Sequence, residues 1–125
     1  MGHPDAGMAC ARERRGVNDR RYVVEPDVWH RIVTLPGCAV GIDCEGYVEG
    51  HHILTQQQLR RRGLEGVLWD VRNGIGLCEK HHRRHHSRRA PVARNVLPEC
   101  AFEFAADHQL GWLIERYYPA LEEAA

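Results

Sequence analysis

Two short stretches of the sequence are rich in side chains that bind metal ions. "EGHHIL" (residues 49–54) contains the doublet His51–His52, and "NGIGLCEKHHRRHHSRR" (73–89) adds an asparagine, a cysteine and four histidines. Imidazole nitrogens and thiolate sulfurs are common protein ligands of zinc and related divalent ions. Adjacent residues of a regular strand point to opposite faces, so the doublet could flank one site only at a bent strand end. We interpret the two stretches as two halves of one metal-binding region.

Four of the candidate ligands have a spacing typical of structural zinc. Cys38 and Cys44 lie in a loop of small and turn-forming residues, and Cys78 and His81 are three positions apart where a strand should meet a helix. Two ligands from a loop and two from such a junction form a closed tetrahedral set. The five residues between Cys38 and Cys44 exceed the usual two to four. The alternative is a group of buried thiols in a small core.

The remaining histidines predict a second, open site. His82 and His86 are four residues apart, so on a helix they would lie one turn apart on one face. His81 and His85 have the same spacing and are the competing pair, unless zinc uses His81. With His51 turned toward this helix, three imidazoles would hold a divalent ion and leave positions open, as catalysis requires. The alternative is a titratable basic face without an ion.

Two polar residues would then lie beside the ion. His52 is expected next to it, and a neutral imidazole with a reference pKa of about 6.5 is suited to take a proton from water. Asn73 would either ligate the ion through its amide or hold the loop so that the histidines keep their geometry. An isolated Asn–Gly pair would otherwise indicate only a turn.

Positive charge gathers around these ligands although the formal net charge of the whole chain is zero. Residues 60–94 hold ten Lys and Arg against three Asp and Glu, a net charge near +7. A local basic surface favours a polyanion such as nucleic acid, and the alternative is a solvated arginine face. The side chains predicted to contact phosphates are Arg60, Arg61, Arg62, Arg83, Arg84, Arg88 and Arg89.

The elements that must position these residues follow from local patterns. Thr55 with Gln58 three residues later forms a capping-box signature, which predicts a short helix after the first strand. Residues 64–73 are ambiguous. In chain order, the other predicted elements are a helix from Pro26 to Leu35, a strand over 47–54, a strand over 74–77, a helix over 79–89, and two C-terminal helices begun at Pro98 and ended before Pro119.

Taken together, the sequence resembles the HNH endonuclease family. The resemblance lies in the doublet His51–His52, in Asn73 and in the run "LCEKHHRRHH" from Leu77, which occur in the expected order within residues 38–89. The overall pattern is similar to HNH proteins of bacteriophages and actinobacteria. Zinc-binding members carry two C-x2-C pairs. Here the first pair is stretched, and His81 replaces the last cysteine.

The resemblance implies an α+β fold with a small ββα-metal core, in which an ion lies between a two-stranded hairpin and a helix, stabilised here by zinc and flanked by further helices. It implies that His51, His82 and His86 bind a catalytic divalent ion (Mg²⁺, Mn²⁺, Ni²⁺ or Zn²⁺), that His52 is the general base, and that Asn73 is the motif asparagine. We expect a flexible tail over 1–21, an HNH nuclease domain over 22–94 and a helical extension over 95–125 that packs on it. Cys10 and Cys100 receive no role in either site.

The implied function is metal-dependent hydrolysis of phosphodiester bonds in DNA, with double-stranded DNA, intact or nicked, as partner. The alternatives are a non-catalytic, zinc-stabilised DNA-binding module and a nuclease acting on RNA or junctions. Cleavage of both strands by so small a site would need two copies, so a homodimer is one expected state. No apolar run is long enough for a membrane span, and no secretory signal is recognisable. The odd number of cysteines favours a cytoplasmic location, which would be the cytoplasm of a bacterial host if the protein is encoded by a phage.

Overall fold

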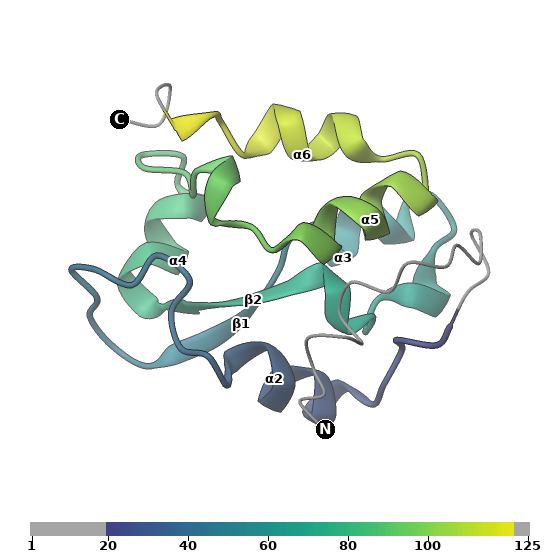
Figure 1. The fold of residues 1–125 in the computed structure, drawn as a ribbon, viewed down its shortest axis with the longest axis horizontal. Coiled ribbons are helices and arrows are strands. Elements are labelled where there is room, and N and C mark those ends of the chain that lie inside the picture. Colours follow the sequence, from purple (N-terminus) through teal and green to yellow (C-terminus); the bar gives the residue numbers. More distant parts are fainter. Residues whose placement is uncertain (1–19, 122–125) are drawn as a thin grey trace.

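The computed structural model describes residues 20–121, which form a small α+β fold with one two-stranded sheet, as predicted (Figure 1). Residues 1–19 of the predicted N-terminal tail, Cys10 included, lie outside the described residues. The strands are β1 (Val48–His52) and β2 (Gly74–Cys78). The α-helices are α2 (Pro26–Thr34), α3 (Gln56–Arg60), α4 (Glu79–His86), α5 (Glu99–Asp107) and α6 (Gly111–Tyr117), and the 3-10 turns are Glu65–Val67, Val71–Asn73 and Arg94–Val96.

The two strands pair antiparallel over their whole length, from Val48 opposite Cys78 to His52 opposite Gly74. Helix α2 covers one face of this hairpin, because the ring of Trp29 occupies the space that side chains at Gly50 and Gly74 would fill. A Cβ atom built at either glycine would lie 2.7 or 2.5 Å from that ring. Since residues two apart on a strand share a face, Gly50 and His52 both face α2, whereas His51 faces the opposite side.

The opposite side of the hairpin carries α4 and the C-terminal helices α5 and α6 (Figure 1). One apolar core joins the end of β1 to these helices: Ile53, Leu77, Phe104 and Ile114 are all at most 2% exposed. Buried ion pairs also link the segment before β2 to α5: Arg72 contacts Asp70 at 2.8 Å and Asp107 of α5 at 3.2 Å. The basic segment therefore includes one arginine that belongs to the core rather than to a surface for phosphates.

Local signals placed most elements correctly. Thr55 and Gln58 form the predicted capping box, in which each side chain accepts from the other residue's backbone N–H. Helix α4 ends earlier than residue 89: Ser87 is its C-cap, and Arg88 takes a positive φ of 65°. The ambiguous segment 64–73 forms two 3-10 turns rather than a helix or strand. Within residues 20–121, no helix has the length and apolar character needed to cross a membrane.

Candidate functional site

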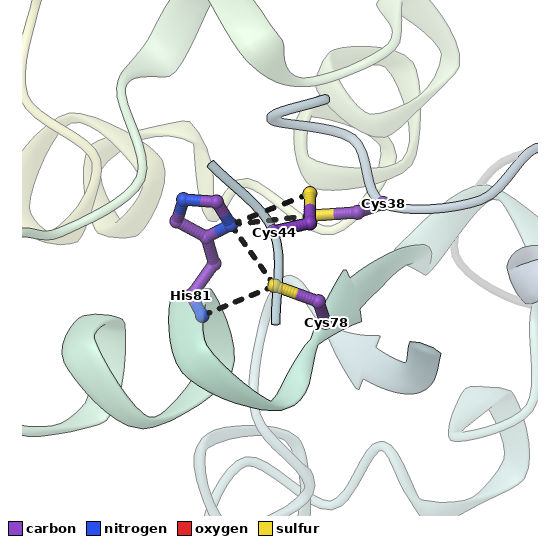
Figure 2. A group of neighbouring side chains, drawn as sticks. All are labelled: Cys38, Cys44, Cys78 and His81. Atoms are coloured by element: carbon purple, nitrogen blue, oxygen red, sulfur yellow. Dashed lines mark hydrogen bonds between the residues drawn. The ribbon is translucent and has the colours of Figure 1, made fainter. Parts of the chain in front are cut away.

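The structure brings Cys38, Cys44, Cys78 and His81 together in one cluster (Figure 2). Cys38 and Cys44 come from the loop between α2 and β1. Cys78 ends β2 and caps α4, and its sulfur accepts the backbone N–H of His81 at 3.4 Å. His81 lies in the first turn of α4. The loop and the strand–helix junction thus meet at four candidate ligands, in the pairing that the sequence predicted.

The donor set fits zinc in both chemistry and spacing. The Nδ1 atom of His81 lies 3.1 Å from the sulfur of Cys78, 3.5 Å from that of Cys38 and 3.9 Å from that of Cys44. Tetrahedral zinc, with bonds of about 2.3 Å to sulfur and about 2.0 Å to nitrogen, would hold its ligands roughly 3.5–3.8 Å apart. A zinc ion would therefore fit here with small adjustments.

The unusual five-residue spacing of the first cysteine pair is accommodated by a loop with several turns. Gly37, Gly41, Asp43 and Gly46 all have positive φ values, which fold the segment back on itself. The loop also docks on the hairpin through a hydrogen bond of 2.8 Å from the N–H of Ala39 to the carbonyl of Gly76. These bends bring Cys44 back toward Cys38 and α4.

The thiols in this cluster influence one another's ionisation. Burial raises the pKa of Cys78, but hydrogen bonds from the backbones of His81 and Glu45 and from the His81 ring outweigh it and lower that pKa to about 6. Desolvation within the cluster, with hydrogen bonds to Cys38 and Cys78, raises the pKa of Cys44 to about 11. Without a cation one thiolate disfavours the next, whereas a bound ion would stabilise all of them.

A second group of ligand atoms lies between another face of α4 and strand β1. One ring nitrogen from each of His51, His82 and His86 lies within 4.8 Å of the others. The Nε2 atoms of His82 and His86 are 3.1 Å apart, and nitrogen ligands at about 2.0–2.1 Å from a metal are roughly 2.9–3.4 Å apart. Burial first, and then the neighbouring histidines, lower the pKa of His51 well below its usual value, so that ring is neutral and keeps a lone pair for an ion.

Two further side chains orient these rings. The Nε2–H of His51 donates to the hydroxyl of Tyr118 at 2.8 Å, and that hydroxyl donates to the carbonyl of Ile53 at 2.8 Å. With its Nε2–H used in these hydrogen bonds, His51 points the lone pair on Nδ1 away from Tyr118. The Nδ1–H of His82 donates to the carboxylate of Glu49 at 2.6 Å, which leaves its Nε2 facing His86. Such partners fix the tautomer and orientation of ligating histidines.

The role of the Tyr118 hydroxyl can be measured directly. Replacing Tyr118 with phenylalanine keeps the ring stacked on His85, at 4.8 Å between ring centroids, but removes the acceptor that fixes His51. We expect Mn²⁺ or Ni²⁺ to bind about 10–100-fold more weakly, as measured by titration calorimetry. Tyr47→Phe, at a site 83% exposed, is the matched control and should bind as the parent does. Equal affinity of Tyr118→Phe and the parent would refute the orienting role.

The structure contradicts the expected position of His52. The hairpin runs regularly through His52, without the bend that would turn both histidines to one side. The ring of His52 stacks on Trp29 with centroids 4.1 Å apart, meets the edge of Trp69, and donates through Nε2 to the carbonyl of Leu68 at 2.8 Å. It therefore lies on the α2 face, opposite the three histidines, rather than beside the predicted ion.

Asn73 and His85 are both engaged by the backbone. The amide of Asn73 accepts from the N–H of Leu54 at 2.8 Å and donates to its carbonyl at 2.9 Å, so it holds the segment after β1 rather than an ion. His85, of the competing pair, accepts the N–H of Val92 at 2.9 Å and is 5% exposed. Its partner in that pair, His81, lies in the cysteine cluster.

The seven arginines predicted to contact phosphates are all exposed. Three of them border the histidines: Arg83 lines a hollow with His82 and His86, and Arg61 and Arg88 line a second hollow that also reaches His86. Arg62 lies just after the end of α3, where it lines a third hollow. The basic surface therefore adjoins the candidate ion site.

Sequence reasoning missed Glu49 and Tyr118. Glu49 precedes His51 by two residues, so a strand pattern could have placed its carboxylate on the same face, toward α4. Tyr118 is remote from His51 in sequence, and only the packing of the C-terminal helices brings it there.

Comparison with known proteins agrees with this geometry. The family model described as HNH endonuclease matches residues 32–90, a segment that contains both groups of candidate ligands. No curated protein and no solved structure matches the chain. Divalent metal ions are used by this family, in keeping with the two groups of donors. Residues 32–90 of this chain therefore belong to the HNH endonuclease family.

Proposed function

We propose that this protein is a metal-dependent endonuclease that hydrolyses phosphodiester bonds in DNA. The observation that carries the proposal is the convergence of His51, His82 and His86 within a segment of the HNH family. The three come from one strand and one helix: His51 is buried, whereas His82 and His86 line a hollow with the exposed Arg83. This donor set suits a catalytic ion, since three histidines leave coordination positions open.

In this proposal the side chains around the ion have separate roles. The three histidines hold the ion, with Tyr118 and Glu49 fixing the orientation of His51 and His82. A divalent ion, when bound, would polarise the scissile phosphate and favour ionisation of water. Arg61, Arg83 and Arg88 would neutralise neighbouring phosphates, so binding should weaken steeply as salt is raised. Structural zinc in the cysteine cluster would fix the first turn of α4.

A plasmid assay tests the proposal. The protein is incubated with supercoiled plasmid and Mg²⁺, Mn²⁺ or Ni²⁺, and nicked and linear products are separated on a gel. Nicking that needs one of these ions and stops with EDTA supports the proposal. Retardation of plasmid without nicking, under every ion tried, would contradict it.

The second candidate is a non-catalytic, zinc-stabilised DNA-binding module. One observation favours it: the packing of His52 between Trp29 and the carbonyl of Leu68 gives this histidine a structural reason to be present. A second histidine in the doublet is therefore no longer an argument for catalysis. The three-histidine group still distinguishes the two functions, because a binding module has no need of an open ion site.

His52 itself separates structure from catalysis. We expect His52→Ala to lower the melting temperature by several degrees, because it empties a stacked, part-buried position. Nicking measured well below that temperature should fall by less than about 10-fold, since the ring faces α2. Loss of a general base would instead cost about 10²–10⁴-fold in a folded variant. Circular dichroism melts and plasmid nicking on the same sample decide between these outcomes.

A further inference from the structure

A groove runs from the three-histidine site along the surface between α3 and α6. Two hollows, about 280 and 350 Å³ in volume, share Gln58, Arg61, Leu113 and Tyr117 in their linings and therefore adjoin one another along this groove. His86 lies in the lining of the first hollow, and Trp112 in that of the second. The groove thus begins at a candidate ion ligand and leads away from it.

The lining of this groove combines positive charge with aromatic rings. Arg61 and Arg88 line the first hollow, Arg62 and Arg116 line the second, and among residues 20–121 no Asp or Glu belongs to either lining. Trp112 is 51% exposed, unusually so for a residue of its size.

Three guanidinium groups lie close to these rings. Arg62 is 5.6 Å from the centre of the Trp112 ring, whereas Arg88 and Arg116 are 5.3 and 5.6 Å from that of Tyr117. Cations thus lie over these rings, and the Trp112 ring is in addition half-exposed, an arrangement that suits a ligand with both phosphates and rings.

We propose that this groove binds a single strand of nucleic acid with unstacked bases. Proteins that bind such strands combine a basic groove with aromatic platforms, because every base offers a face for stacking and every nucleotide a phosphate. A duplex would offer its phosphates but keep its bases stacked inside, so Trp112 and Tyr117 would gain little from it. The inference rests on the proposed function in one respect: the strand bound here is taken to continue into the site of cleavage at His86.

Binding of a labelled oligothymidylate, measured by fluorescence anisotropy without added divalent ions, tests this inference. We expect the single strand to bind more tightly than a duplex of the same length. Trp112→Ala should weaken single-strand binding by about 10-fold, and the duplex much less. Tyr47→Ala, at an exposed aromatic residue in the loop before β1, is the matched control and should change neither. Equal affinity for strand and duplex, or equal losses in the two variants, would overturn the proposal.

Two further measurements cover other outcomes. Quenching of tryptophan fluorescence by the oligonucleotide should largely disappear in Trp112→Phe, which keeps a ring at this position; unchanged quenching would count against the groove. Oligouridylate in place of oligothymidylate distinguishes RNA from DNA as the source of the strand. The binding assay requires no cleavage. If Trp112→Ala loses strand binding but the parent protein leaves plasmid uncut, only the proposed nuclease activity is refuted. Nicking with no effect of Trp112→Ala on strand binding would refute only the groove.

Discussion

Replacing Cys78 with alanine is expected to remove one bound zinc per chain and with it the cooperative folding of the domain. Cys78 is fully buried, ends β2 and caps α4, so its sulfur joins the hairpin, the helix and the loop of Cys38 and Cys44. Structural zinc contributes about 10–16 kcal/mol in small zinc-binding peptides, whereas whole domains are stable by only about 5–15 kcal/mol. Zinc content by elemental analysis and a thermal melt by circular dichroism measure the two effects.

Cys100→Ala is the matched control for this experiment. Cys100 is also buried, at 4% exposure, but lies in α5 outside the cluster. It should retain its zinc and lose only the modest stability expected when a small buried side chain is shortened. A Cys78→Ala protein that still binds one zinc and melts like this control would refute the proposed zinc site.

Replacing His86 with alanine is expected to reduce metal-dependent nicking by about 10²-fold or more while leaving the fold intact. His86 is exposed, so its loss should change the free energy of unfolding by only about 0.5 kcal/mol. Its Nε2 atom, however, is one of three candidate ligands, and loss of a ligand should exceed the roughly 10–100-fold cost of losing a residue that orients one. Plasmid nicking over a range of Mn²⁺ concentrations measures the loss.

A second exposed histidine provides the comparison. His30→Ala alters α2, on the other face of the hairpin, and should nick plasmid at the parent rate. If both variants kept full activity with unchanged dependence on Mn²⁺, the three-histidine group would not be the site of hydrolysis.

The ligand groups could be predicted from sequence because their geometry is local. His82 and His86 lie one turn apart on any helix, and Cys78 and His81 form a junction that a strand followed by a helix always creates. The capping box at Thr55 depends on only four residues. The closeness of Cys38 and Cys44 is less local, because it depends on the turns at positive φ that shorten the path of their loop.

The side of the hairpin on which His52 lies could be predicted only on the assumption that β1 is regular to its end. Strand alternation separates neighbours, and the two glycines Gly50 and Gly74 leave a flat surface for a large ring such as Trp29. The sequence alone did not reveal that β1 continues straight through His52, since a bend at a strand end depends on the partner strand. The 3-10 turns of 64–73 were equally unpredictable, because they are held by contacts with distant parts of the chain, such as the ion pair of Arg72 and Asp107.

The hydrogen bond between Tyr118 and His51 bears on how the ion affinity of such a domain can change. Tyr118 follows α6 and lies well beyond residues 32–90, yet it touches a candidate ligand and the backbone of Ile53. We infer that ion affinity can be retuned from outside the recognisable motif, by repacking the C-terminal helices while every ligand stays the same. Two chains with identical HNH signatures could then prefer different metals, and a fragment trimmed to its signature would be a poor stand-in for the intact protein.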